Sequence, residues 1–74
     1  MNACILIRVL PGKPAAAALE AVKKLPEVKS AHLVLGRYDI VAFAEAPTFE
    51  AVSSLSSKMN TIKELKSTET LIEG

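Results

Sequence analysis

The segment LVLGRYDIVAF, residues 33–43, determines how the middle of the chain folds. Two apolar runs flank a short polar step, as expected for two β-strands joined by a tight turn. Glycine tolerates positive φ, and it suits the first position of a two-residue type II′ turn. Gly36 and Arg37 are therefore predicted to form such a turn between strands at residues 28–35 and 39–45.

Four further elements surround this hairpin. Residues 3–9, ACILIRV, form a β-prone run that ends at a PGKP stretch. Apolar residues at helical spacing follow and stop at Pro26. A second helix is predicted to open with Pro47 at the first helical position and Thr48 as a candidate cap. The last strand is predicted at residues 65–73.

The predicted order β-α-β-β-α-β is that of a ferredoxin-like α+β plait. Right-handed βαβ crossovers then place both helices on one face of a four-stranded antiparallel sheet. With 74 residues, the chain is expected to form a single domain over 1–74. A sheet with one solvated face should alternate apolar and polar residues, yet residues 5–7 and 40–43 are unbroken apolar runs, so both faces are apolar. The uncovered face needs a partner, most simply a second copy of the same sheet.

Composition argues against several classes of function. Nine basic and eight acidic residues are mixed along the chain, so direct contact with nucleic acid and binding to an anionic membrane are not expected. No apolar run approaches the roughly 20 residues that a membrane-spanning helix needs, and the N-terminus lacks the pattern of a signal peptide. A lone cysteine, Cys4, cannot form an internal disulfide. These features favour the cytoplasm.

Polar residues at two places form a candidate ligand site. Tyr38 combines an apolar ring with a polar tip, and Asp39 is a poor strand former at the start of a strongly apolar strand. Two interpretations of Asp39 stay open: its carboxylate grips an ammonium group, or it accepts hydrogen bonds from the turn. Thr68 and Thr70 are two apart on a strand, so their hydroxyls share one face. Either the two threonines are present only because threonine favours β-strands, or their hydroxyls bind a small polar ligand.

The segments ILIRVLPG, LPEVKSAHLVLGRYDIVAF and STETLI together resemble the ligand-sensing (RAM) domain of the Lrp/AsnC, or feast/famine, transcription regulators. The resemblance covers essentially the whole chain. Its most specific parts are G-x-Y-D at residues 36–39 and T-x-T at residues 68–70. Family members join this domain to an N-terminal helix-turn-helix, for which this chain has no room. The chain therefore resembles the stand-alone form, and DNA binding by the chain itself is not expected.

The resemblance implies a small-molecule sensor that assembles. Such domains pair sheet to sheet as dimers, the dimers form rings, often octamers, and amino acids bind between neighbouring dimers and shift the assembly. Full-length Lrp/AsnC regulators are candidate partners. Arg37 and Glu69 occupy variable positions that can tune ligand choice, with Glu69 ranked lower because it alternates to the opposite face. The implied ligand-binding residues are Gly36, Arg37, Tyr38, Asp39, Thr68 and Thr70.

Other interpretations of the same fold find less support. A small dimeric α+β-barrel enzyme would need catalytic groups, but His32 lies inside a strand and Cys4 reads as a small buried hydrophobe. No carboxylate pair or metal spacing is apparent, so no catalytic residue, metal or cofactor is predicted. An RNA-binding plait would need more aromatic residues on its central strands than Phe43 alone. An ACT-type plait fits the G-x-Y-D and T-x-T signals less well. A ligand-free adaptor that co-assembles with full-length regulators stays open as the alternative function.

Overall fold

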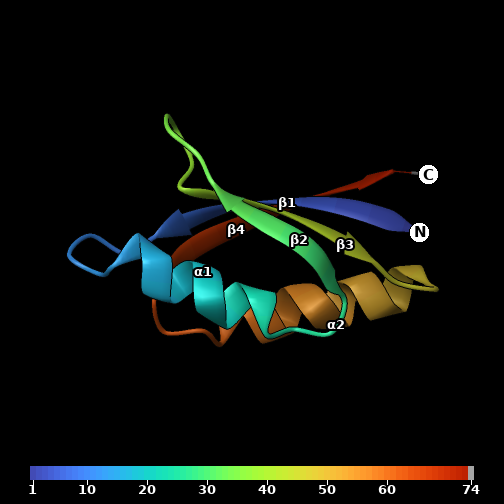
Figure 1. Ribbon diagram of the computed structural model, residues 1–74. Helices are drawn as coiled ribbons and strands as arrows, with labels where there is room; N and C mark the ends of the chain where they lie inside the picture. Colours follow the sequence, from blue (N-terminus) through green and yellow to red (C-terminus); the bar gives the residue numbers. More distant parts are fainter. Residues whose placement is uncertain (74) are drawn as a thin grey trace.

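The computed structural model describes residues 1–73, which form a four-stranded antiparallel sheet and two helices (Figure 1). The strands lie in the order β2-β3-β1-β4, so β1 and β3 are central and β2 and β4 are the edges. Both helices cover the same face of the sheet (Figure 1). The predicted ferredoxin-like α+β plait is thus confirmed. The elements are β1 Asn2–Val9, α1 Ala15–Lys23, β2 Val28–Leu33, β3 Ile40–Glu45, α2 Phe49–Asn60 and β4 Leu65–Glu73.

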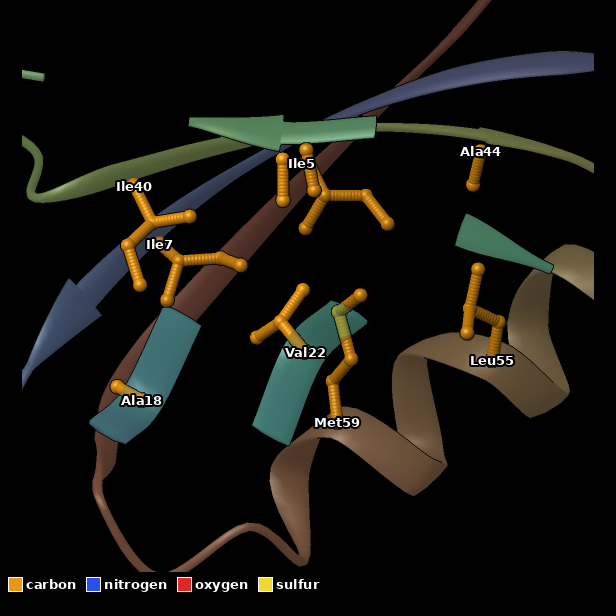
Figure 2. Packing of buried hydrophobic residues seen from close by; sticks show 10 residues of the cluster. Ile5, Ile7, Ala18, Val22, Ile40, Ala44, Leu55 and Met59 are labelled. Carbon is orange, nitrogen blue, oxygen red and sulfur yellow. The ribbon is translucent and has the colours of Figure 1, made fainter. Parts of the chain in front are cut away.

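The main core lies between the helices and the sheet. Alternate residues of the two central strands point toward the helices, and side chains from α1 and α2 meet them there (Figure 2). Full burial of a valine, leucine, isoleucine or methionine side chain contributes about 1.5–3 kcal/mol to the free energy of folding, relative to leaving the side chain exposed. The largest fully buried side chains of this layer are Ile5, Ile7, Val22, Ile40, Leu55 and Met59.

The opposite face of the sheet is also apolar, and neither helix covers it. Residues directly opposite in an antiparallel ladder place their side chains on the same face. In β1, the partners of Cys4 are Phe43 and Leu71, and Leu6 pairs with Val41. Phe43 is 46% exposed and Leu71 is 52% exposed. The prediction that both faces are apolar is confirmed, and we call these five residues the open face.

The loop between β2 and β3 is longer than the predicted two-residue turn. β2 ends at Leu33 and β3 begins at Ile40. Between them, the Val34 N–H donates to the Asp39 carbonyl oxygen at 2.9 Å, which closes a loop over residues 35–38. The prediction of a type II′ turn is therefore wrong.

Tyr38 lies outside the strand ladder in the wider loop. A two-residue turn would require Tyr38 to pair with Leu35 across the strands, whereas Tyr38 here hydrogen-bonds to Glu69 of β4, with 2.6 Å between their oxygens. Gly36 takes a positive φ of 124°, as predicted, in a region that favours glycine. The loop projects from the end of the sheet on the side away from the helices (Figure 1).

Thr48 caps the N-terminus of α2. Its Oγ1 accepts the Ala51 N–H at 3.1 Å, and its backbone is extended, with φ −140° and ψ 164°. The cap prediction is confirmed. Pro47, by contrast, does not occupy the first helical position, which belongs to Phe49. An extended residue at the cap cannot lie within the helix, so Pro47 remains in the connection that precedes it.

Replacing Thr48 with alanine is expected to lower the free energy of unfolding by about 1 kcal/mol. The Ala51 N–H would lose its side-chain acceptor at the start of the helix. Urea denaturation at a fixed protein concentration measures the change, and Thr48→Ser, which keeps a hydroxyl, is the matched control. Equal stability of Thr48→Ala and Thr48→Ser would show that the cap contributes nothing.

Candidate functional site

Asp39 is bonded to the end of β1. Its Oδ2 accepts the Val9 N–H at 2.8 Å, and its own N–H donates to the Ile7 carbonyl oxygen at 2.9 Å. The ladder between β1 and β3 ends at the pair Ile7 and Ile40, so the carboxylate supplies the acceptor that the strand no longer provides. The hydrogen bond thus comes from β1 and not from the turn.

Tyr38 links the loop to β4 across the helix-free side of the sheet. Its hydroxyl donates to Glu69 Oε2 at 2.6 Å. The Arg8 guanidinium carbon lies 5.8 Å from the centroid of the Tyr38 ring, within the range of a cation–π contact. Arg8 Nε also donates to the Arg37 carbonyl oxygen at 3.1 Å. We call Arg8, Tyr38 and Glu69 the clamp, because together they tie the loop to β1 and β4.

The hydrogen bond to Glu69 raises the pKa of Tyr38 above its ordinary value of 10.0, since the carboxylate favours the protonated phenol. Desolvation and the negative charge of Glu69 act in the same direction, and the charges of Arg37 and Arg8 oppose them. A folded-state pKa above the unfolded value means that this stabilisation is complete below the unfolded pKa. It is lost as the pH rises through the folded pKa.

The titration of Tyr38 is therefore expected to occur above pH 10.0 and to shift back toward that value in Glu69→Ala. The chain has one tyrosine and no tryptophan, so the ultraviolet absorbance of the phenolate reports this residue alone. An exchange of Glu50, an exposed glutamate on α2, to alanine is the control and should leave the titration unchanged. The same pKa in the parent protein and in Glu69→Ala would contradict the clamp.

Thr68 and Thr70 share one face of β4, and it is the face toward α2. Thr68 Oγ1 donates to Asn60 Oδ1 at 3.2 Å, and the hydroxyls of Thr70 and Ser56 lie 3.0 Å apart. In the ladder with β1, the two threonines are opposite the buried Ile7 and Ile5. Their hydroxyls are thus engaged with the helix in this chain.

The residues that the sequence grouped into one site therefore lie in two places. Tyr38 meets Glu69, the residue ranked lower, on the helix-free side, while Thr68 and Thr70 bond to α2. The sheet lies between the two groups, because Glu69 and the two threonines point to opposite faces of β4. Gly36 and Arg37 are exposed in the loop. Sequence reasoning missed Arg8, Ser56 and Asn60 as neighbours of these residues, although Arg8 is the only charged residue of ACILIRV and could have been singled out.

A hollow of about 450 Å³ lies at the other end of the sheet, and it contains none of the sequence-predicted ligand residues. Its apolar part is formed by Cys4, Phe43 and Leu71 of the open face. Charged side chains from three strands border it: Lys29, Glu45 and Glu73. We call these six residues the hollow.

The described part of the chain contains neither a metal-binding cluster nor a membrane-spanning helix. Residues 1–73 contain no group of three or more His, Cys, Asp or Glu side chains that could hold a metal ion. Among the same residues, no helix has the length and apolar character needed to cross a membrane.

A sequence profile of the Lrp/AsnC ligand binding domain matches residues 2–73 of the chain. The match includes the loop, the clamp and both threonines. A comparison with curated protein sequences finds no significant match.

Solved structures of the same fold include small proteins and longer regulators. TTHA0845 from Thermus thermophilus is 30% identical with a TM-score of 0.91, over 99% of this chain and 91% of that one. AsnC from E. coli is 33% identical with a TM-score of 0.87, over 97% of this chain and 49% of that one, so the chain spans about half of AsnC. The regulator NMB0573 from Neisseria meningitidis, solved in complex with L-Met, is 21% identical with a TM-score of 0.83 over 97% of this chain and 49% of that one. At that identity the likeness shows the fold alone.

Proposed function

Because the chain belongs to the Lrp/AsnC ligand-binding domain family, we propose that it is a non-enzymatic module that senses an amino acid and assembles in response. Two copies pair sheet to sheet, and the dimers form a ring such as an octamer. The amino acid binds between neighbouring dimers. Residues 1–74 act as one domain in the cytoplasm, alone or together with full-length regulators, and the assembly serves the regulation of transcription.

The proposed dimer rests on the open face. Phe43 and Leu71 are about half exposed on the side of the sheet that the helices leave uncovered (Figure 1). A two-fold contact between two such faces would remove the same apolar patch of both copies from water. The aromatic ring of Phe43 is the largest side chain of the patch and would be the anchor of the contact.

The main observation behind the proposed ligand site concerns the loop of residues 34–39. The part of this loop next to the sheet is held in place by hydrogen bonds, and its tip is exposed. Asp39 is bonded to Val9, and the clamp holds Tyr38 and the backbone of Arg37. Gly36 and the side chain of Arg37 remain exposed. A loop that is ordered before the ligand arrives loses less conformational entropy on binding.

An amino acid needs a partner for each of its charged ends. The Arg37 guanidinium is suited to bidentate hydrogen bonds with an α-carboxylate, and the Asp39 carboxylate is suited to the ammonium group. The Tyr38 ring offers apolar surface to the ligand side chain. Because Thr68 and Thr70 lie on the opposite side of the sheet from Tyr38 in their own chain, we assign the threonines of each site to a subunit of the neighbouring dimer, where each hydroxyl can make a further hydrogen bond beside the one to α2.

The coupling to assembly follows from the position of the ligand. A ligand that contacts two dimers at once has a higher affinity for the closed ring than for free dimers. The ligand can shift the equilibrium between free dimers and the ring only by the difference between its affinities for these two states.

Replacing Asp39 with asparagine is expected to weaken amino-acid binding by about 10- to 100-fold, the range that a lost charge-assisted hydrogen bond gives. Asparagine keeps an oxygen acceptor for the Val9 N–H but has no charge for the ammonium group. Isothermal titration calorimetry with each of the twenty amino acids measures the affinity, and sedimentation checks that the dimer persists. Glu20→Gln, which removes an exposed charge from α1, is the control.

This experiment distinguishes an error in the assigned ligand-binding residue from an error in the proposed function. Unchanged affinity in Asp39→Asn would show that this carboxylate does not contact the ligand. A parent protein that binds none of the twenty amino acids would instead contradict the sensor and favour the ligand-free adaptor.

A further inference from the structure

The loop between β2 and β3 carries an apolar side chain at its most exposed point. Leu35 has a relative accessibility of 103%, the highest among the exposed large apolar residues. The loop rises on the side of the sheet that the helices leave bare (Figure 1). The loop that carries Leu35 is therefore accessible to whatever covers the open face.

The hollow is a recess with an apolar part, and it lies at the other end of the open face from the loop that carries Leu35. It is bordered by the start of β1 and the ends of β3 and β4, whereas the loop contacts the end of β1. Ile7, which bonds to Asp39, and Cys4, in the hollow, are three residues apart, or about 10 Å along the strand. Each chain thus has a projecting leucine at one end and an apolar recess at the other.

We propose that in the sheet-to-sheet dimer Leu35 of each copy fills the hollow of the other, an inference that rests on the dimer proposed above. A two-fold axis that lies between the sheets and runs across the strands reverses the strand direction, so it places the loop of one copy over the hollow of its partner. An axis along the strands would place both loops at one end and leave both hollows empty at the other. The arrangement across the strands fills both recesses and brings Leu6 and Val41, midway between the two features, close to the axis.

The charges at the two ends favour the same arrangement. Arg37 follows the tip of the loop, and the hollow is bordered by Glu45 and Glu73 together with Lys29. With one loop over each hollow, the positive charge of Arg37 is attracted at long range by the carboxylates of the partner subunit, without a direct contact that would occupy the guanidinium. The alternative axis along the strands would place the two hollows at the same end of the dimer and bring the glutamates of both copies together.

This contact would also order the loop that carries the proposed ligand residues. Leu35, seated in the partner subunit, and Asp39, bonded to Val9, would fix both sides of Gly36 and Arg37. The dimer would then present a rigid edge to the neighbouring dimer, and each ligand site would depend on both copies of its own dimer.

The native cysteine of the hollow allows a direct test. In Leu35→Cys, mild oxidation is expected to link position 35 to the partner's Cys4, producing a covalent dimer on non-reducing gels whose link is mapped by peptide mass spectrometry. Leu35→Cys combined with Cys4→Ser, and Phe49→Cys on α2, are the controls that should not give this link. A link between the two copies of position 35, or no link in a protein that sedimentation shows to be dimeric, would overturn the inference.

A second variant separates this inference from the dimer itself. Leu35→Asp is expected to raise the dimer dissociation constant at least about tenfold, whereas Phe49→Asp, at an exposed phenylalanine of the helical layer, should not. If Phe43→Asp dissociates the dimer while Leu35→Asp does not, the sheet-to-sheet dimer stands and the role of Leu35 is wrong. A monomeric parent protein would overturn both, and protection of Cys4 from alkylation by an added amino acid would assign the hollow to a small ligand instead.

Discussion

Replacing Phe43 with aspartate is expected to convert the dimer to a monomer. The exchange places a charge inside an apolar contact, where it would have to be desolvated without a partner. Truncation of a buried anchor residue typically weakens an interface by about 2 kcal/mol or more, so the dissociation constant should rise at least about 30-fold. Sedimentation equilibrium over a range of protein concentrations measures this constant.

The control for Phe43→Asp is Phe49→Asp. Phe49 is 56% exposed at the start of α2 and lies outside the open face. Both variants add one negative charge and remove one phenylalanine ring, so only the location differs. Equal effects of the two exchanges on dimerisation would refute the open face as the interface.

Replacing Leu55 with alanine is expected to lower the free energy of unfolding by about 2–5 kcal/mol. Leu55 is fully buried, and it packs with Met59 beneath the central strands (Figure 2). The exchange removes buried apolar surface and leaves a cavity that the surrounding helix and sheet fill only in part. A small domain has a total stability of about 5–15 kcal/mol, so the loss would be a large share of it.

Urea denaturation at one protein concentration measures the loss, because dimerisation makes stability depend on concentration. Leu33→Ala is the matched control, since Leu33 lies on edge strand β2 and is 51% exposed. It should lower the stability far less. Comparable losses at the two positions would mean that the core is not organised around Leu55 as described.

The order of the six elements was readable from the sequence because hydrophobic period and turn residues agree along the chain. The last strand was predicted over residues 65–73 and is observed at Leu65–Glu73. The length of the central loop was not readable. The loop is held by long-range contacts, among them the hydrogen bond between Tyr38 and Glu69 across 31 positions, and no local pattern encodes such contacts. Pro47 was predicted at the first helical position and lies two residues before it, because the sequence did not show that Thr48, as the cap, would precede the first helical residue.

The candidate site was only partly accessible from the sequence. Strand alternation correctly placed Thr68 and Thr70 on one face and Glu69 on the other. It could not show which face the loop would join, because loop side chains follow no period. The position of Asp39 depends on where the β1–β3 ladder ends, and this is a property of the assembled sheet. Arg8 was overlooked because a single charge in a strand is usually only solvated.

Native mass spectrometry of the purified protein, with and without a pool of the twenty amino acids, tests the proposed sensor most directly. It reports the number of subunits and the bound mass in one spectrum. We expect a multiple of dimers that retains amino-acid mass, with a larger share of rings when the pool is present. A distribution of subunits that does not change with the pool, and that carries no added mass, would contradict amino-acid sensing by this domain.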